Sequence, residues 1–275
     1  MKKNMIGVIV AIVVSFVTTG SCIAEEVNVS GVVRTDYYSD ADKASISQVR
    51  FNLYAPMATD TYYFVRVEPN RYNLDGEDWL KLFFIQYKNI TGGRLPSNEG
   101  YALPTPDKLF TAMWPRISGG FYTNGIQITE MLSAGYTVTF EVSGSPNGTA
   151  VRDNLGYSQV SMRLTKGTTN IILRYDDDRN SQILVSGEKS FAKMLAREAF
   201  YWRSDGGTVK SGGYVFLEKK VSPSFCLHAQ TDFAKDAETI NTVGIRIVRG
   251  KKFVILDREF SAGRQRTLAS VVVTF

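Results

Sequence analysis

From residue 27 onward, apolar and polar residues alternate along the chain in runs of about 8 to 12 residues. In the first run the apolar positions are Val27, Val29, Val33 and Tyr37, and the polar positions are Asn28, Ser30, Arg34 and Asp36. The same alternation recurs in residues 48–53, 63–68, 136–142, 159–164, 225–233 and 242–247. A period of two residues is typical of β-strands with one apolar and one polar face. The sequence therefore predicts an all-β protein.

Alternation also occurs in soluble β-proteins, so the architecture depends on three further features. Aromatic residues recur at strand ends on the apolar face, namely Tyr37, Tyr63, Tyr87, Tyr136, Tyr175 and Phe233, as in the interfacial girdles of membrane proteins. Long polar connections alternate with short ones, and the last alternating run ends at Phe275. We therefore expect residues 25–275 to form a transmembrane antiparallel up-and-down β-barrel whose apolar face meets lipid.

Fifteen connections separate the alternating runs, which predicts sixteen strands with both ends on the periplasmic side. Two segments leave this number open. Residues 191–202 alternate poorly, place Glu198 on the lipid face and also fit a short amphipathic helix. Residues 251–259 have a similar conflict at Asp257 and Arg258. Without one or both of the weak hairpins, the barrel has fourteen or twelve strands.

The first 24 residues fit a cleaved signal peptide. Lys2 and Lys3 precede an apolar run at residues 6–17, and small side chains lead to Ala24, after which the sequence becomes polar. A permanent helical anchor is the first alternative, but the run is shorter than the roughly 20 residues that span a bilayer. Lipoprotein processing at Cys22 is the second, but the residues before it lack the aliphatic side chain usual in a lipobox. We expect cleavage after Ala24.

Cleavage leaves 251 residues and lowers the formal net charge from +5 to +3, because Lys2 and Lys3 are removed. This mild excess contains no run of Lys and Arg, so we expect no nucleic-acid partner. Hydrophobic residues make up an ordinary 44% of the chain, as expected when only every second residue of a strand faces lipid. Cys226 has no partner for an intramolecular disulfide once Cys22 is gone.

The chemistry that enzymes need is largely missing from the sequence. His228 is the sole histidine, and Cys226 is the one nucleophile close to it. At two residues apart on one strand the two side chains would be roughly 7 Å apart, too far for direct proton transfer. No metal-ligand cluster, phosphate-binding glycine loop or nucleotide motif occurs. We expect no enzymatic activity, no metal and no cofactor.

The final strand carries the most specific local signal. Counting back from Phe275, the residues Val273, Val271, Ala269 and Thr267 share one face. A terminal aromatic residue preceded by apolar residues at every second position resembles the signal of outer-membrane β-barrel proteins that the barrel-assembly machinery recognises. The resemblance implies the bacterial outer membrane as the location. The alternative is an ordinary strand that ends at a phenylalanine.

Three short segments resemble Gram-negative outer-membrane porins. Residues 29–34 (Val-Ser-Gly-Val-Val-Arg) look like the first porin strand. Residues 86–88 and 92–94 look like the hairpin whose arginine, here Arg94, enters the pore just before the third loop. Residues 124–127 (Asn-Gly-Ile-Gln) look like the strand that follows this loop. The resemblance implies outer-membrane lipid as surroundings, small hydrophilic solutes as cargo and a possible homotrimer, although the chain is shorter than most sixteen-stranded porins.

The third external loop of porins folds into the barrel and narrows the channel, and residues 97–120 occupy the corresponding place. This segment is the longest connection and carries Leu109, Phe110 and Trp114, which is too apolar for a loop surrounded by water. We therefore expect it to lie in the lumen as a constriction or plug, with a subunit contact as the alternative.

Charged residues on the polar face are expected to line the lumen. Arg34, Arg50 and Arg66 lie on the first three strands and should be neighbours on one wall. The other arginines expected on this face are Arg94, Arg163, Arg174 and Arg246, and the carboxylates are Asp36, Glu68, Glu141, Asp176 and Asp232. These groups either form ion pairs that rigidify a wet interior or create a transverse field that selects ions.

The excess of permanently charged arginine favours anions slightly. The sequence thus predicts a porin-like channel for passive diffusion of small hydrophilic solutes with a mild anion preference. The alternatives are a barrel without a channel, serving as a structural protein or adhesin, and a soluble periplasmic β-protein.

Overall fold

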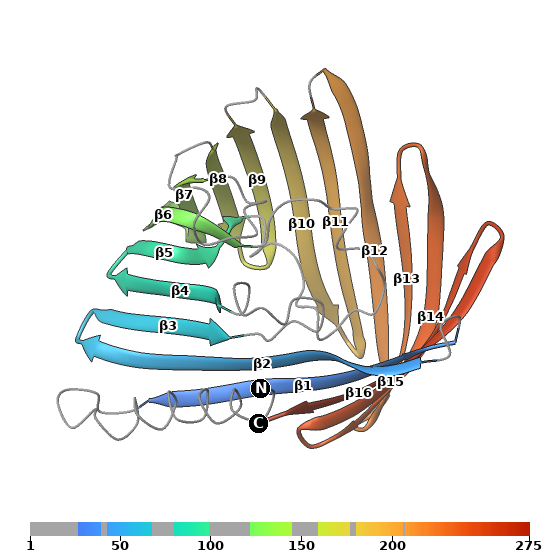
Figure 1. Ribbon diagram of the computed structural model, residues 1–275. Coiled ribbons are helices and arrows are strands. Elements are labelled where there is room, and N and C mark those ends of the chain that lie inside the picture. The colour runs from blue at the N-terminus through green and yellow to red at the C-terminus, as the bar shows by residue number, and fades with distance from the viewer. Residues whose placement is uncertain are drawn as a thin grey trace, which may run out of the picture.

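The computed structural model describes residues 27–39, 43–67, 80–98, 122–144, 159–176, 180–205 and 207–275. Within these ranges sixteen strands form one closed antiparallel barrel (Figure 1). The strands are β1 (Asn28–Tyr38), β2 (Lys43–Ala58), β3 (Thr61–Val67), β4 (Leu80–Tyr87), β5 (Ile90–Pro96), β6 (Tyr122–Met131), β7 (Tyr136–Ser143), β8 (Gln159–Lys166), β9 (Thr169–Asp176), β10 (Ser181–Phe191), β11 (Met194–Asp205), β12 (Thr208–Ser222), β13 (Phe225–Ala234), β14 (Ala237–Arg249), β15 (Lys252–Ser261) and β16 (Arg264–Thr274).

The predicted all-β barrel of sixteen strands is confirmed, and the smaller strand numbers are wrong. The helix considered for residues 191–202 is also wrong, because this segment contains the end of β10 and most of β11. The two strands pair from Phe191↔Met194 to Ser181↔Ser204 without a register shift. Glu198 is exposed on the outer face, as the fifth of the twelve residues of β11.

In the described residues each strand pairs with the next, and β1 pairs with β16 to close the barrel. The strand order defines two ends, and we call the end at which β1 begins and β16 finishes the terminal rim. The connections at the terminal rim are short, and η2 (Ser133–Gly135) forms one of them. Left-handed residues such as Lys88 (φ 51°) and Ala192 (φ 53°) make these tight reversals, since such dihedrals match the twist of paired strands.

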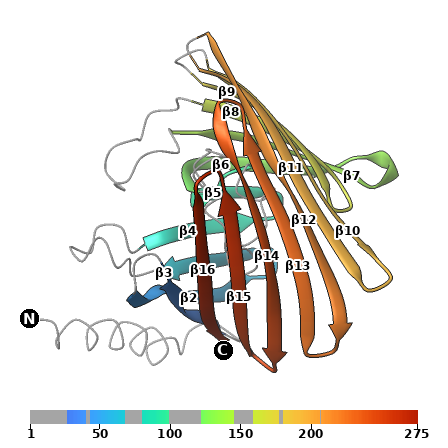
Figure 2. The ribbon, with the colours of Figure 1, turned by 90° about the vertical axis from the view of Figure 1, so that its right-hand side faces the viewer.

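At the opposite rim some connections predicted as loops continue the sheet. Residues 203–213 are rich in polar residues and glycine and therefore resemble one of the long polar connections, but β11 extends to Asp205 and β12 begins at Thr208. The register Arg203↔Lys210 keeps the two strands hydrogen-bonded over this segment. Polar side chains are compatible with a strand that projects into water, so polarity alone does not mark the strand end. Figure 2 shows β11 and β12 in one wall with β13 to β16.

The two faces of the wall differ in exposure as the alternation predicts. In β16, Val271 is 51% exposed while the next residue, Val272, is fully buried. In β15, Val254 and Leu256 are exposed on the outer face, whereas the next residue, Asp257, is buried on the inner face. Apolar side chains thus cover the outer face, and polar side chains are concentrated on the inner face. Such a surface is suited to lipid outside and a polar lumen inside.

The seam between β1 and β16 is closed by the last residue. The amide and carbonyl groups of Gly31 and Phe275 exchange two hydrogen bonds of 3.1 and 3.2 Å. The Phe275 ring lies over Gly31 and packs against Phe51 with a centroid distance of 5.9 Å. A Cβ atom at Gly31 would lie 2.2 Å from Cζ of Phe275, so the glycine provides the space for the ring.

In the part of the chain that the structure describes, no helix is long and apolar enough to cross a membrane.

Candidate channel lining

Three of the arginines expected in the lumen form a diagonal row across β1, β2 and β3. Arg50 pairs in register with Val32, two residues before Arg34 in the same strand. Arg66 pairs with Asn52, two residues after Arg50. Successive arginines are therefore diagonal neighbours on the inner face, at a Cα separation of roughly 7–8 Å. Arg34 and Arg50 are buried, whereas Arg66 is half-buried.

The other expected arginines differ in their placement. Arg163, Arg174 and Arg246 lie on the inner face of β8, β9 and β14, in the phase of buried polar neighbours. Arg94 does not, and its expected place in the lumen is wrong. It pairs with Phe83, which is exposed on the outer face, while Leu95 beside it is completely buried in an inner cluster. The run Thr91-Gly92-Gly93-Arg94 has no apolar side chain that would reveal the phase.

Several inner arginines are paired with carboxylates. Arg34 Nε lies 2.7 Å from Asp36 Oδ1 on the same strand. Three further pairs cross between strands, Arg197 with Glu188, Arg246 with Glu218 and Arg266 with Glu259. The sequence argument missed Glu188, Glu218 and Arg266, and it also missed Arg197 and Glu259, which lie in the two segments where alternation is weak. These pairs match the ion-pair alternative, in which opposite charges neutralise each other locally.

The transverse-field hypothesis assumed that Glu141 faces the arginine side chains of the lumen. Its environment in the structure is different. It lies on β7, is 1% exposed and accepts hydrogen bonds from Gln127 Nε2 at 2.7 Å and Ser143 Oγ at 3.0 Å. Gln159 Nε2 donates at 3.3 Å, and the backbone N–H of Asn98 donates at 2.8 Å. The carboxylate therefore binds the protein's own donors and holds the chain that follows β5.

Asn98 marks where the third connection leaves the wall. Its side-chain amide donates to Ser161 Oγ at 2.9 Å and to the carbonyl of Thr139 at 3.3 Å. Ser97 and Asn98 are both buried, so the connection begins on the inner face of the barrel. The residues expected to form the constriction, Leu109, Phe110 and Trp114, lie outside the described residues. Glu68 also lies outside them, as does the predicted signal peptide.

His228 is paired with a carboxylate two strands away. Its Nε2 atom lies 2.6 Å from Asp257 Oδ1, and the residue between them in register is Gly244 of β14. The imidazole also packs on the Phe216 ring with a centroid distance of 5.8 Å. Cys226, the neighbour weighed as a nucleophile, instead lies 3.8 Å from a terminal nitrogen of Arg246. In the structure His228 therefore pairs with Asp257, and this contact joins two strands of the wall.

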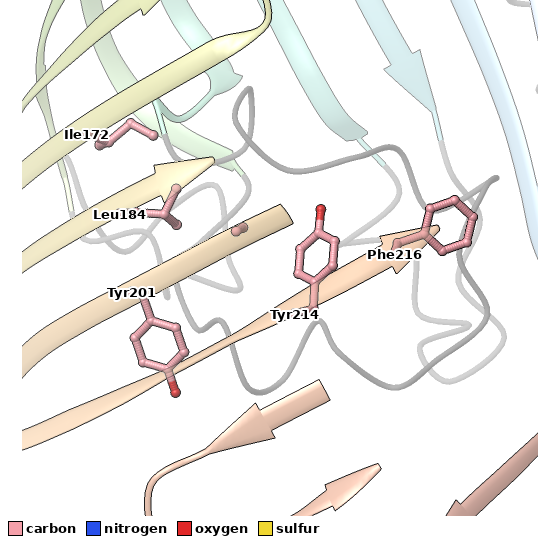
Figure 3. Close-up of a cluster of buried hydrophobic side chains, with 6 residues drawn as sticks. Ile172, Leu184, Tyr201, Tyr214 and Phe216 are labelled. Carbon is pink, nitrogen blue, oxygen red and sulfur yellow. The ribbon is translucent and has the colours of Figure 1, made fainter. Parts of the chain in front are cut away.

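Apolar clusters also face inward, among them the two described next, which the sequence argument did not predict. One contains Ile172, Leu184, Tyr201, Tyr214 and Phe216 with Ala199, from β9 to β12 (Figure 3). The other contains Leu82, Phe84 and Leu95, with Tyr62 and Phe64 packed against it. Their strands carry apolar residues on both faces, so alternation gives no signal there. The inner wall is consequently divided into charged and apolar sectors.

Comparison with known proteins gives structural matches only. No protein-family model matches the chain, and no curated protein sequence matches it. Among solved structures, the outer-membrane channel DcaP of Acinetobacter baumannii has a TM-score of 0.62 at 13% identity, covering 93% of this chain and 99% of that one. OmpT of Vibrio cholerae, in a trimer form, has a TM-score of 0.60 at 10% identity, covering 92% and 100%.

An anion-selective porin from Comamonas acidovorans has a TM-score of 0.61 at 12% identity, covering 91% of this chain and 99% of that one. At these identities the likeness concerns the fold. The matches span nearly the whole length on both sides, as does the closed sixteen-stranded sheet in the described residues. The protein therefore has the fold of outer-membrane porins, as the short sequence resemblances indicated.

Proposed function

We propose that the protein is a passive diffusion channel in the bacterial outer membrane for small hydrophilic solutes, with a mild preference for anions. The observation that carries the proposal is the diagonal row of Arg34, Arg50 and Arg66 on the inner face of a closed barrel. Barrels of sixteen strands are wide enough to leave an aqueous lumen. Fixed guanidinium charges along this lumen attract anions at close range and stay ionised at working pH.

Two features support the mild degree of the preference. Arg34, Arg197, Arg246 and Arg266 each have a carboxylate partner, so a large part of the inner positive charge is neutralised. Among the contacts within the described ranges, Arg66 has no carboxylate partner, so its charge is not neutralised there. The structurally similar porin from Comamonas acidovorans is described as anion-selective, which agrees with this sign.

The proposal extends to assembly and location. Residues 1–24 act as a signal peptide, and the barrel-assembly machinery recognises the strand face of Val271, Val273 and Phe275. Strand β5 has seven residues, fewer than the roughly 9–11 needed to cross a bilayer. A wall this low is suited to a contact with another subunit, which supports a homotrimer, and OmpT of Vibrio cholerae has a trimer form. N-terminal sequencing of the mature protein should begin at Glu25.

Planar lipid bilayers test the channel directly. Protein purified in detergent should insert with discrete conductance steps, and a gradient of potassium chloride should give a reversal potential of the sign expected for anion preference. Insertion without conductance would refute the channel, and cation selectivity would refute the arginine argument. The channel proposal includes no catalytic role for His228.

A further inference from the structure

A row of aromatic rings lies on the inner face of β2 to β4. Tyr54 and Tyr62 have ring centroids 4.9 Å apart, and Tyr62 meets Phe84 edge-on at 6.5 Å. Phe64 stacks on Phe84 at 5.3 Å with an interplanar angle of 21°. Tyr54 is 38% exposed, and Tyr62 and Phe64 are half-buried. The rings therefore present an accessible aromatic surface on the side of the wall that carries Arg50 and Arg66.

Arg66 adjoins this surface and has spare binding capacity. Its Nε donates to Asn52 Oδ1 at 2.8 Å, and its guanidinium carbon lies 5.7 Å from the centroid of the Phe64 ring. Among the contacts made by the described residues, Arg66 has no carboxylate partner, unlike Arg34 with Asp36. The terminal nitrogens of Arg66 are thus available to an anion, and a guanidinium group binds a carboxylate through two parallel hydrogen bonds.

Ring and cation are also correctly spaced for one small molecule. Phe64 and Arg66 are two residues apart on the same face, which is about 7 Å along the strand, and Tyr54 pairs in register with Phe64. A solute whose ring lies on Tyr54 and Phe64 can direct a carboxylate attached to that ring toward Arg66. A bare inorganic anion would use the arginine and leave the rings in contact with water, which is unfavourable for an apolar surface.

We propose that Tyr54, Phe64 and Arg66 form a subsite that binds aromatic carboxylates inside the lumen. This proposal deepens the proposed channel function, since it names a class of solute that the channel would retain and pass. The ring contributes stacking and apolar contact, and the carboxylate contributes the charge-assisted pair. Neither part alone would bind as well as the two together.

The binding test uses the full-length mature protein in detergent and 4-fluorobenzoate as the probe, followed by the broadening of its fluorine NMR signal. Competition then ranks unlabelled benzoate, acetate and benzamide. Benzoate should compete at least about tenfold better than acetate or benzamide, because each competitor lacks one of the two contacts. Equal competition by all three, or preference for a sugar phosphate over benzoate, would overturn the proposal.

Matched variants locate the site. Phe64→Leu and Arg66→Gln should each weaken benzoate relative to acetate by about fivefold or more, whereas Phe64→Tyr should retain binding because it keeps the ring. Phe253→Leu and Arg163→Gln remove a ring and a charge from the inner face of other strands, and should change this ratio by less than about twofold. Equal losses in both sets would show a general effect of charge or folding and would overturn the assignment.

Conductance separates this proposal from the channel itself. Benzoate should reduce the potassium chloride current at concentrations where acetate does not, and Arg66→Gln should abolish the difference. If the protein conducts but does not bind 4-fluorobenzoate, the channel proposal stands and the subsite proposal is refuted. If the protein binds 4-fluorobenzoate but never conducts, the subsite proposal stands and the channel proposal is refuted.

Discussion

His228 and Asp257 bind each other across an intervening strand, with Nε2 and Oδ1 2.6 Å apart. The strand between them contributes Gly244 at the same level of the register. Because glycine has no side chain, the imidazole and the carboxylate meet over its backbone. The pair therefore links β13 to β15 directly, in addition to the backbone hydrogen bonds that join each of them to β14.

Substitution of Gly244 tests this contact. A Cβ atom there would lie 1.9 Å from Asp257 Oδ1 and 2.5 Å from His228 Nε2, so Gly244→Ala must separate the two side chains. We expect a loss of about 1–3 kcal/mol in the free energy of unfolding, as for other overpacked interior sites. Thermal unfolding followed by gel mobility of the unheated and heated protein measures it. Gly92→Ala, where no atom lies within 4 Å of the added Cβ, is the control.

Substitution of Glu141 should release the start of the third connection. The Asn98 amide donates to the Glu141 carboxylate at 2.8 Å, and hydrogen bonds to charged groups contribute about 1.5–3 kcal/mol. In Glu141→Gln the amide hydrogen of Asn98 should therefore exchange with deuterium about tenfold faster or more. Hydrogen exchange with mass spectrometry of the peptide containing Asn98 provides the measurement. Glu130→Gln, the control, removes a carboxylate of β6 that binds Asn89 instead, and the exchange of Asn98 should be unchanged in this variant.

The two faces of the wall predict opposite results for two arginine variants. Arg50→Gln should lower the permeability of anions relative to cations, because Arg50 lies on the inner face. Arg94→Gln removes the same charge from the outer face and should leave the reversal potential unchanged. The measurement is the reversal potential in a salt gradient. A shift for Arg94→Gln as large as that for Arg50→Gln would contradict the face assignment.

Phe275 is expected to affect both assembly and stability. Phe275→Ala removes the ring that packs on Phe51, and an aromatic pair contributes about 0.5–1.5 kcal/mol beyond buried area. If the assembly machinery also recognises the ring, the amount of heat-modifiable barrel in outer membranes should fall by more than the lost stability of the purified variant explains. Phe140→Ala removes an exposed outer ring on β7. It serves as the control, and an equal fall for it would refute the special role of Phe275.

Much of the barrel could be predicted from the sequence because its strands alternate. The phase of Val271 and Phe275 sets the outer face of β16, and the same logic places Arg34 and Arg50 inside. Alternation is a local property of each strand and does not depend on its partners. The face on which each residue of such a strand lies can therefore be predicted even when the strand's partners and their register are unknown.

The parts that could not be predicted depend on register or on strands without alternation. Arg94 follows two glycines, which carry no information about the face, and its phase is set by the pairing with Phe83. The contact between His228 and Asp257 requires the registers of two successive hairpins. The inward cluster around Phe84 lies on a strand that reads Leu-Lys-Leu-Phe-Phe-Ile-Gln-Tyr, in which apolar residues occupy both faces.

The seam at Gly31 has a consequence for how the molecule can enter a bilayer. A sheet in which the pairing of β1 with β16 has not formed has two open edges, and the peptide groups along them lack partners. Each unpaired peptide group costs several kcal/mol in hydrocarbon, so a nearly complete wall is as unsuited to lipid as a single hairpin. The two hydrogen bonds between Gly31 and Phe275 lie at the end of the pairing that removes both edges at once. Insertion into lipid and closure of the barrel must therefore be coupled, because only the pairing of the first strand with the last removes both open edges.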